Sequence, residues 1–295
     1  MIIAYSKNPF QQTFGILIHN IWRILFCLIC AAVAYATHDI FGHSYVKLPA
    51  VPISILGGAL AIFLGFRNSS AYDRWWEARK IWGEIVNNSR AFTMQLLTYS
   101  SKGESTEMEF ETWQKEVIYR HIGWVYALKS VLRKEPYCKE LQYWIPEKDE
   151  STLKDKSNIP TQLLAIQGQE LKYALHKGWI EDFRLYNLTG LVTKLYDNQG
   201  KCERIKNTVF PFYYNYFTRL FLWLFIICLP FALVESMDWV SIPMSIAIGF
   251  VFTVLEKSGI NTEDPFEGRA SDIPLENLCR NIEIDLREMI EDTNI

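Results

Sequence analysis

Two cysteines have a spacing that suits redox or zinc chemistry, but their surroundings do not. Cys27 and Cys30 form a C-x-x-C pair inside an apolar run, with no His, Asp or second cysteine pair close by in the sequence. Packing within a helix is therefore the better interpretation. The other cysteines are scattered, as expected for a protein in a reducing cytoplasm and not for a disulfide framework. They are Cys138, Cys202, Cys228 and Cys279.

The five histidines do not form a recognisable catalytic group. His38 and His43 flank a short connection between two apolar runs and could meet at a metal ion, although loop histidines are more often solvated. His19, His121 and His176 are isolated. The chain has no Gly-rich phosphate loop, no G-x-S-x-G and no H-E-x-x-H motif. No reaction is suggested, and we expect a protein that is not an enzyme.

The composition favours a membrane protein. The chain has 295 residues, of which 49% are hydrophobic and 15% aromatic, and its 10 tryptophans suit membrane interfaces. The formal net charge is −3 and no block of Lys and Arg occurs, so nucleic acid is not an expected partner.

Four uncharged runs approach the length that a helix needs to cross a bilayer. The first run extends back past Arg23 towards Gly15, and two of the four are short. Any one of them alone could be a buried core helix of a soluble protein, but together they predict four membrane helices. They are residues 24–37, 48–66, 220–234 and 239–255.

Basic residues gather on one side of these runs. The connections on the other side are acidic ("ESMD") or carry only Lys47 as a firm positive charge. By the positive-inside rule, both termini and the middle of the chain are cytoplasmic. The basic residues are Arg67, Arg74, Arg79 and Lys80 after the second run, and Lys201, Arg204, Lys206 and Arg219 before the third.

The middle of the chain is predicted to be helical. Apolar residues recur at helical spacing in 109–134 and 181–208, whereas 137–160 is richer in charge and Pro and suits a loop or short helices. We therefore expect an all-α fold. Its parts are a first transmembrane pair (1–66), a helical cytoplasmic domain (67–217), a second transmembrane pair (218–256) and a cytoplasmic C-terminal segment (257–295).

The second run has two neighbouring helix faces of different character. One is a ridge of small residues that lets another helix approach closely. The other lies about 100° further round the helix and carries bulky apolar side chains, which could line an apolar constriction or face lipid. The ridge is Gly57, Ala61 and Gly65, and the neighbouring face is Gly58, Ile62 and Phe66.

A dense group of charges and tryptophans follows this run without a Pro or Gly break. Like charges four residues apart are unfavourable unless they are neutralised, so we expect buried ion pairs between helices. A cation–π contact between Trp75 and Arg79 is available at the same spacing. The group consists of Asp73, Arg74, Trp75, Trp76, Glu77 and Arg79.

Two long segments carry a family resemblance. "FLGFRNSSAYDRWWEARKIWG" (63–83) resembles the signature of prokaryotic bestrophins, and "EDPFEGRASDIPLENLCRNIEIDLREM" (263–289) resembles the second marked segment of that family. The resemblance covers nearly the whole chain. It implies a homopentameric ion channel in the bacterial inner membrane, with five copies of the second membrane helix around a central pore.

The resemblance also implies particular pore residues. The apolar neck falls on Ile62 and Phe66, and Gly58 stands one turn above them, where the family often has a bulky side chain. A second, cytoplasmic constriction is expected near Ile180, although an insertion or deletion in the preceding loop would shift that match.

Calcium is not a supported cofactor. In animal bestrophins a dense acidic run after the last membrane helix binds calcium, which takes six to eight oxygen ligands. This chain has acids there but no consecutive run, so local ion pairs at the start of a helix are the better interpretation. The weak metal candidates are Glu263, Asp264, Glu267 and Asp272.

The expected function is conduction of small monovalent ions. Asp39, Glu235 and Asp238 at the outer mouth favour sodium or potassium, with chloride and other anions as the alternative. A membrane-anchored enzyme or ligand-binding sensor is a competing interpretation. A carrier built from inverted repeats is another, but the second and fourth runs hold few polar residues.

Overall fold

The computed structural model describes residues 18, 20–40, 48–135 and 139–292, and every element within them is a helix. The expected all-α class is thereby confirmed for the described residues. His19, His43, Lys47 and Cys138 lie outside them. The α-helices are α2 (Ile21–Tyr35), α3 (Ala50–Tyr99), α4 (Glu107–Leu132), α5 (Glu147–Leu153), α6 (Ile159–His176), α7 (Asp182–Asn207), α8 (Phe212–Met237), α9 (Ser241–Glu263) and α10 (Leu275–Met289). Short π or 3₁₀ segments are η1 (Ala36–Ile40), η3 (Lys139–Tyr143) and η4 (Asp238–Val240).

The chain divides into two compact units. The first comprises Met1–Tyr72 and Val209–Glu263, and the second comprises Asp73–Thr208 and Asp264–Ile295. The divisions lie several residues from those expected at 66, 217 and 256, because α3, α8 and α9 continue beyond their apolar runs. Helix α3 contributes to both units.

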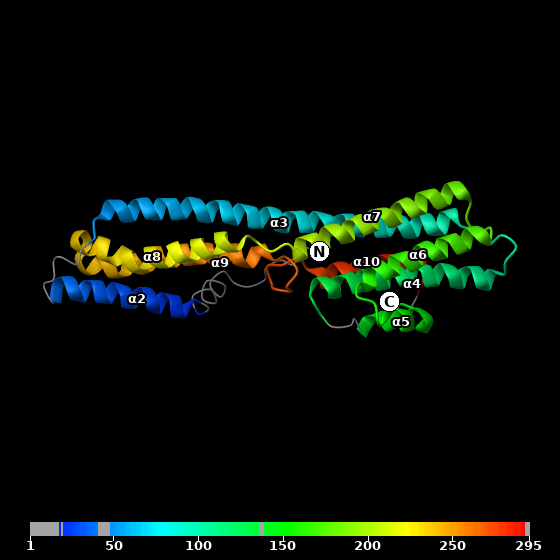
Figure 1. Ribbon diagram of the computed structural model, residues 1–295. Coiled ribbons are helices and arrows are strands. Elements are labelled where there is room, and N and C mark those ends of the chain that lie inside the picture. The colour runs from blue at the N-terminus through cyan, green and yellow to red at the C-terminus, as the bar shows by residue number, and fades with distance from the viewer. Residues whose placement is uncertain (1–17, 19, 41–47, 136–138, 293–295) are drawn as a thin grey trace. The chain divides into compact units, whose positions relative to one another are not determined.

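The first unit contains α2, α8, α9 and the first part of α3 (Figure 1). Helix α2 packs against α8 and α9, which also pack against each other. Cys27 of α2 lies against Gly249 of α9, where a methyl group would be only 2.9 Å from the sulfur. Both cysteines of the C-x-x-C pair are free, and Cys27 belongs to the buried core of this unit. The buried apolar core consists of Cys27, Leu60, Leu64, Leu222, Phe225, Ile226 and Leu229.

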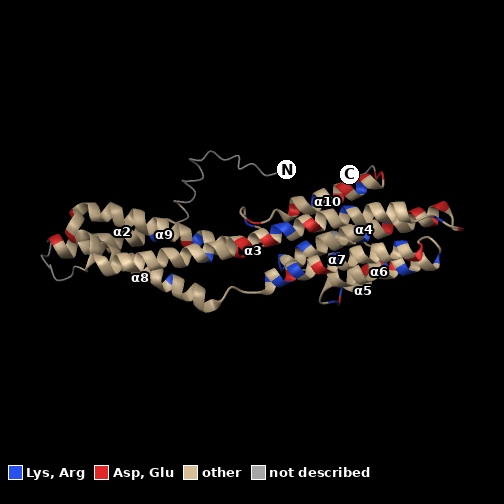
Figure 2. Cartoon of the chain, turned by 90° about the horizontal axis from the view of Figure 1, so that it is seen from above, with Lys and Arg blue, Asp and Glu red and all other residues tan. Residues whose placement is uncertain are grey.

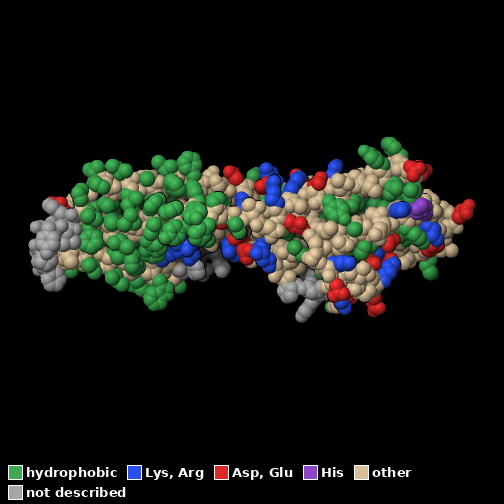
Figure 3. Space-filling view, viewed as in Figure 1, with side chains coloured by type: hydrophobic (Ala, Val, Ile, Leu, Met, Phe, Trp, Pro, Cys, Tyr) green, Lys and Arg blue, Asp and Glu red, His purple; other side chains and the backbone are tan. Residues whose placement is uncertain are grey.

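Three helical stretches in the described residues are long and apolar enough to cross a membrane: Ile21–Asp39, Ala50–Tyr99 and Phe212–Glu263. The last contains both α8 and α9, joined through η4. Charged residues are sparse along α2 and α8 (Figure 2), and apolar side chains cover the displayed face of this unit (Figure 3). An apolar surface this extensive suits lipid or another copy of the chain rather than water.

The second unit packs α4 against α6 and α10, and α6 against α7 (Figure 1). Helix α4 starts where the hydroxyl of Thr106 accepts a hydrogen bond from the backbone nitrogen of Glu109 at 3.3 Å. Helix α6 starts in the same way at Asn158, whose side chain accepts from Thr161 N at 3.1 Å. The predicted helices at 109–134 and 181–208 correspond to α4 and α7, and the charged stretch between them holds η3 and α5.

Candidate ion pathway

Helix α3 leaves one of its faces uncovered by its own chain. Leu60 and Leu64 are buried against α8, whereas Ile62 is 62% exposed and Phe66 is 67% exposed. Because successive residues turn by about 100°, positions 62 and 66 lie on nearly one line along the helix. The two residues expected at the neck therefore share an exposed apolar face.

Phe63 belongs to a different part of the helix surface. Its ring stacks on that of Tyr214 in α8, with 5.1 Å between the centroids, and its carbonyl oxygen accepts a hydrogen bond from the Tyr214 hydroxyl at 3.2 Å. Phe63 thus contacts its own chain, which makes it a suitable control for its neighbour Ile62.

The small residues of α3 have unequal surroundings. A methyl group at Gly57 would lie 2.8 Å from the ring of Phe225, so this glycine permits the close approach of α8. Gly58 and Gly65 have no neighbouring atom within 4 Å of such a methyl, and Ala61 is exposed. Of the predicted ridge, only Gly57 packs within one chain. Contact of Ala61 and Gly65 with another copy remains a prediction.

The charged and aromatic group after Phe66 makes contacts between helices, as expected, but much of it is exposed. Arg204 of α7 donates to Glu77 at 2.5 Å, and both side chains are about half exposed. Asp73 is exposed as well. Neither Glu77 nor Asp73 is buried within one chain, and their burial in ion pairs with another copy remains a prediction.

The remaining members of this group have other partners. Arg74 donates to the carbonyl oxygen of Ile205, and Trp75 donates to that of Ser271 at 3.2 Å and stacks on Trp76. The guanidinium of Arg79 extends towards Gly83, one turn further along α3. Arg79 therefore points away from Trp75, and these two residues form no cation–π pair in the part of the chain that the structure describes.

Two buried charged residues of the first unit, Arg67 and Glu256, have ion-pair partners that were not expected from the sequence. Arg67, which is 3% exposed, donates to Glu263 at 3.3 Å. Glu256 of α9 is 1% exposed and lies 3.2 Å from Arg23 of α2 and 3.6 Å from Arg219 of α8. The only signal in the sequence is one charged residue next to each apolar run. These residues are Arg23 before the first run, Arg67 after the second, Arg219 before the third and Glu256 after the fourth.

The acidic residues near the end of α9 each have a partner within their own unit. Glu267 accepts from Lys206 at 2.6 Å, and this hydrogen bond is the main cause of its lowered pKa. Asp272 accepts from the backbone nitrogen of Arg269 at 3.0 Å, and Asp264 lies 3.9 Å from Arg74. Among the described residues, no three His, Cys, Asp or Glu side chains are grouped so that they could hold a metal ion.

The segment expected to form the cytoplasmic constriction holds one buried and one exposed apolar residue. Ile180 is only 3% exposed and belongs to the core of the second unit, whereas Phe183, in the first turn of α7, is 78% exposed. A side chain that lines a pore between copies must be uncovered in the single chain. Ile180 does not meet this condition, because it turns into its own core before α7 begins, and Phe183 does.

The acidic residues expected at the outer mouth are exposed. Asp39 lies 3.0 Å from the Nδ1 atom of His38, and Glu235 and Asp238 lie at the end of α8. His38 therefore has a carboxylate partner at that site.

Comparisons with known proteins agree with this arrangement. Residues 10–288 match the family model described as "Bacterial/Fungal Bestrophin protein". The voltage-dependent anion channel-forming protein YneE of Escherichia coli K12 is 32% identical over 255 residues, covering 86% of this chain and 81% of that protein. A protein of the same description from Nostoc, alr2987, is 30% identical and covers 96% and 92%.

The fold also resembles that of a solved bestrophin structure. The bacterial bestrophin homolog from Klebsiella pneumoniae has a TM-score of 0.85 at 28% identity, covering 92% of this chain and 98% of that one. The similarity extends through both units. The chain therefore belongs to the bacterial and fungal bestrophins, a family of ion channels and not of enzymes.

Proposed function

We propose that copies of this chain assemble around an axis and conduct small monovalent ions through a pore lined by α3. The observation that carries the proposal is the exposed apolar face at Ile62 and Phe66 on a helix long enough to cross a membrane. One such helix cannot enclose a pore, so several copies must contribute one each.

The proposed assembly is a homopentamer, and the number five rests on the family resemblance. Measuring the mass of the purified protein in detergent tests it. A main species of five chains is expected, and a monomer or dimer would contradict it.

In the proposed membrane arrangement, the second unit and both termini lie in the cytoplasm and the first unit spans the inner membrane. Support comes from the basic residues around the second unit, including Arg74 and Arg204. Labelling of single cysteines introduced near the C-terminus, in spheroplasts and in broken cells, tests the orientation.

The sign of the permeant ion has two candidates. Anions are the first, because the two relatives from E. coli and Nostoc carry the description of anion channel-forming proteins. Sodium or potassium is the second, favoured by the exposed acids Asp39, Glu235 and Asp238. The apolar neck has no charge and cannot choose between them. The reversal potential under a salt gradient decides by its sign.

Reconstitution into liposomes tests conduction itself. Liposomes that contain the purified protein should release a potassium or chloride gradient faster than empty liposomes. If correctly folded, assembled protein gives no flux of either ion, the proposed function is wrong.

A further inference from the structure

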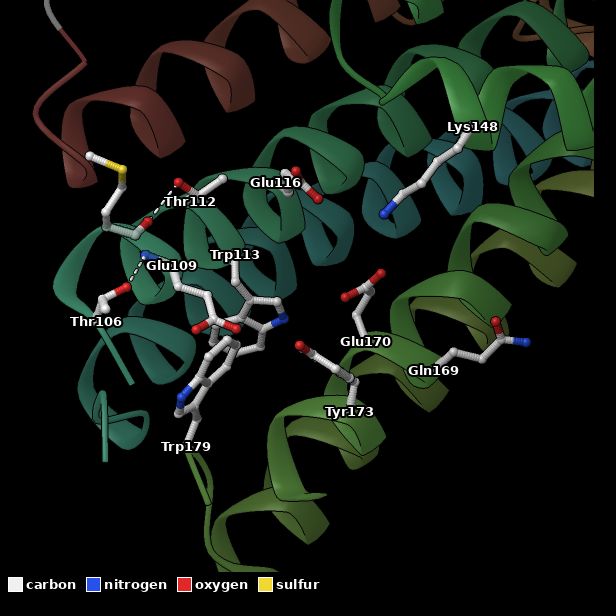
Figure 4. Close-up of a pocket in the computed structure, with 11 residues that line it drawn as sticks. Thr106, Glu109, Thr112, Trp113, Glu116, Lys148, Gln169, Glu170, Tyr173 and Trp179 are labelled. Carbon is white, nitrogen blue, oxygen red and sulfur yellow. Dashed lines mark hydrogen bonds between the residues drawn. The ribbon is translucent and has the colours of Figure 1, made fainter. Parts of the chain in front are cut away.

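Two of the carboxylates that line the large pocket of the second unit are already paired with cations (Figure 4). This pocket has a volume of about 670 Å³ and is formed mainly by α4, α6 and the turn after α6. Glu109 accepts from Lys177 at 3.0 Å, and Glu170 lies 3.6 Å from the buried guanidinium of Arg120. Charge is therefore largely balanced there, whereas in the first unit a group of cations exceeds its carboxylates.

Three cations of the first unit lie at the edges of its apolar runs. Arg23 stands at the start of the run in α2, Arg219 directly before the run in α8, and Lys257 just after the run in α9. Because α9 returns along α8, these edges lie at the same end of the unit. Lys257 is also held to the beginning of α2, since its Nζ atom donates to the side chain of Asn20 at 3.3 Å.

One buried carboxylate holds both arginines. Glu256 lies 3.2 Å from Arg23 and 3.6 Å from Arg219, and its side chain is 1% exposed. Within the described residues, these are the ion pairs of the two arginines, and Lys257 has none. Three positive charges thus stand against one negative charge, which leaves an excess of two positive charges at this end of the unit.

The guanidinium groups can be reached from outside the protein. The side chain of Arg219 is 60% exposed and that of Arg23 is 33% exposed. The notch between them, which Trp223 and Thr253 also line, has a volume of only about 10 Å³ and is no larger than a water molecule. A ligand of these arginines therefore lies on their outer side and not between the helices.

An exposed apolar surface begins beside the two arginines. The ring of Phe26 in α2 meets that of Trp223 in α8 edge-on at 5.0 Å, one turn along each helix from Arg23 and Arg219. Trp22 is 81% exposed, as is typical of a tryptophan at a membrane boundary. Further exposed apolar side chains continue along both helices and suit acyl chains: Leu25, Leu28, Ile29, Leu224 and Ile227.

This combination of charge and apolar surface selects one kind of ligand. In the proposed membrane arrangement the arginines lie at the edge of the hydrocarbon region, where a cation without a counter-ion is costly. The fork of a guanidinium group matches the oxygens of a phosphate group, and basic groups between helices at the membrane surface attract anionic headgroups. A free phosphate ion would leave the apolar surface unused, and a zwitterionic headgroup carries a cation of its own.

We propose that Arg23, Arg219 and Lys257 bind the phosphodiester headgroup of an anionic phospholipid, whose acyl chains lie along α2 and α8. The two arginines donate to the phosphate oxygens, Lys257 adds positive charge, and Glu256 holds both guanidinium groups in position. The inference rests on the proposed membrane position of the first unit but not on conduction, so its test needs no measurement of ion flux.

Native mass spectrometry of the full-length protein in detergent, titrated with phosphatidylglycerol, tests the proposal. The control is phosphatidylcholine with the same acyl chains, and phosphatidylglycerol should bind about tenfold more tightly. Glycerol 3-phosphate has the phosphate but no acyl chains and should not displace the lipid at about millimolar concentration. Equal binding of the two lipids would overturn the proposal. Displacement by glycerol 3-phosphate would show a site for soluble phosphates and would also overturn it.

Matched variants locate the headgroup. Arg219→Gln should weaken phosphatidylglycerol binding about three- to tenfold and leave phosphatidylcholine binding unchanged. Arg184→Gln is the control, because Arg184 of the second unit is 42% exposed and also has a carboxylate partner, Glu181, at 3.5 Å. It should bind both lipids as the parent does. If the two variants behave alike, the lipid is bound elsewhere and the assignment is wrong.

Lys257 separates a lipid site from a merely structural ion pair. Lys257→Gln removes a positive charge but leaves both arginines paired with Glu256, so it should also reduce the preference for phosphatidylglycerol. If Arg219 serves only to neutralise Glu256, Lys257→Gln leaves the preference of the parent unchanged. That result, in a variant that unfolds at the temperature of the parent, would contradict the proposed site.

Discussion

Asn68 of α3 and Gly259 of α9 are in direct contact, with the Asn68 side chain lying where any other residue at 259 would place its Cβ atom. The amide nitrogen of Asn68 donates to the carbonyl oxygen of Leu255 at 3.0 Å, one turn earlier in α9. This contact joins the first part of α3 to α9 within the first unit.

Gly259→Ala should therefore destabilise the protein. The added methyl group would overlap the side-chain oxygen of Asn68, so the two helices must separate or the hydrogen bond to Leu255 must break. We expect a loss of about 1–3 kcal/mol, seen as a lower unfolding temperature in detergent. Gly168→Ala in α6 is the control, since nothing lies within 4 Å of its added methyl. It should be neutral or stabilising by up to about 1 kcal/mol.

The buried carboxylate of Glu256 gives a second prediction. Glu256→Leu would leave Arg23 and Arg219 without their counter-ion, and we expect a loss of about 3–5 kcal/mol, reduced to the extent that these two arginines reach water. Glu107→Gln breaks an exposed pair with Lys102 and should cost less than about 1 kcal/mol. Denaturant unfolding of both variants measures the contrast, and similar losses would show that burial of Glu256 is not what matters.

His121 gives a prediction about pH. Complete burial lowers its pKa to about 3, and its Nε2 atom lies 2.9 Å from the hydroxyl of Ser89. The unfolded chain binds a proton at His121 below about pH 6.5, whereas the folded chain does not until about pH 3. This stabilising contribution is complete above pH 6.5 and is lost as the pH falls towards 3.

Between pH 7 and pH 5 the folded protein should lose about 2 kcal/mol through this group. His121→Gln should lower stability at neutral pH but flatten the dependence in that range. His176→Gln, at an exposed histidine, should keep the dependence of the parent. An unchanged slope in His121→Gln would show that other groups cause the acid sensitivity.

The periodicity of apolar residues was enough to predict the helices. It located α4 and α7 to within about two residues of each end, and the unbroken run after Phe66 predicted that α3 continues into the charged segment. Periodicity does not show which residues from distant parts of the sequence contact each other. Glu256 and Arg23 are 233 positions apart, and no local pattern states that they meet.

Side-chain direction at the ends of helices was also beyond the sequence pattern. Ile180 and Phe183 are both apolar residues close to the start of α7, yet one is in the core and the other is exposed. The conformation of the turn after α6 decides this, and Gly178 has a positive φ there.

Phe183 and Ile180 can be separated by mutation. If Phe183 lines the proposed cytoplasmic constriction, Phe183→Ala should raise ion flux in liposomes and leave the unfolding temperature nearly unchanged. Ile180→Ala creates a cavity in the core and should cost about 2–5 kcal/mol. A rise in flux with Ile180→Ala alone, at unchanged stability, would return the constriction to Ile180.

Single-channel conductance of three α3 variants tests most directly whether the exposed face of α3 lines the pore. Ile62→Ala and Phe66→Ala widen and wet the proposed neck in every copy at once, and each 1.4 kcal/mol removed from the barrier raises the rate about tenfold. Phe63→Ala removes a ring that stacks on Tyr214 and should lower stability without raising conductance. If this face lines the pore, conductance rises for Ile62→Ala and Phe66→Ala only. Equal behaviour of all three variants, or lower conductance of the first two in intact assemblies, would contradict it.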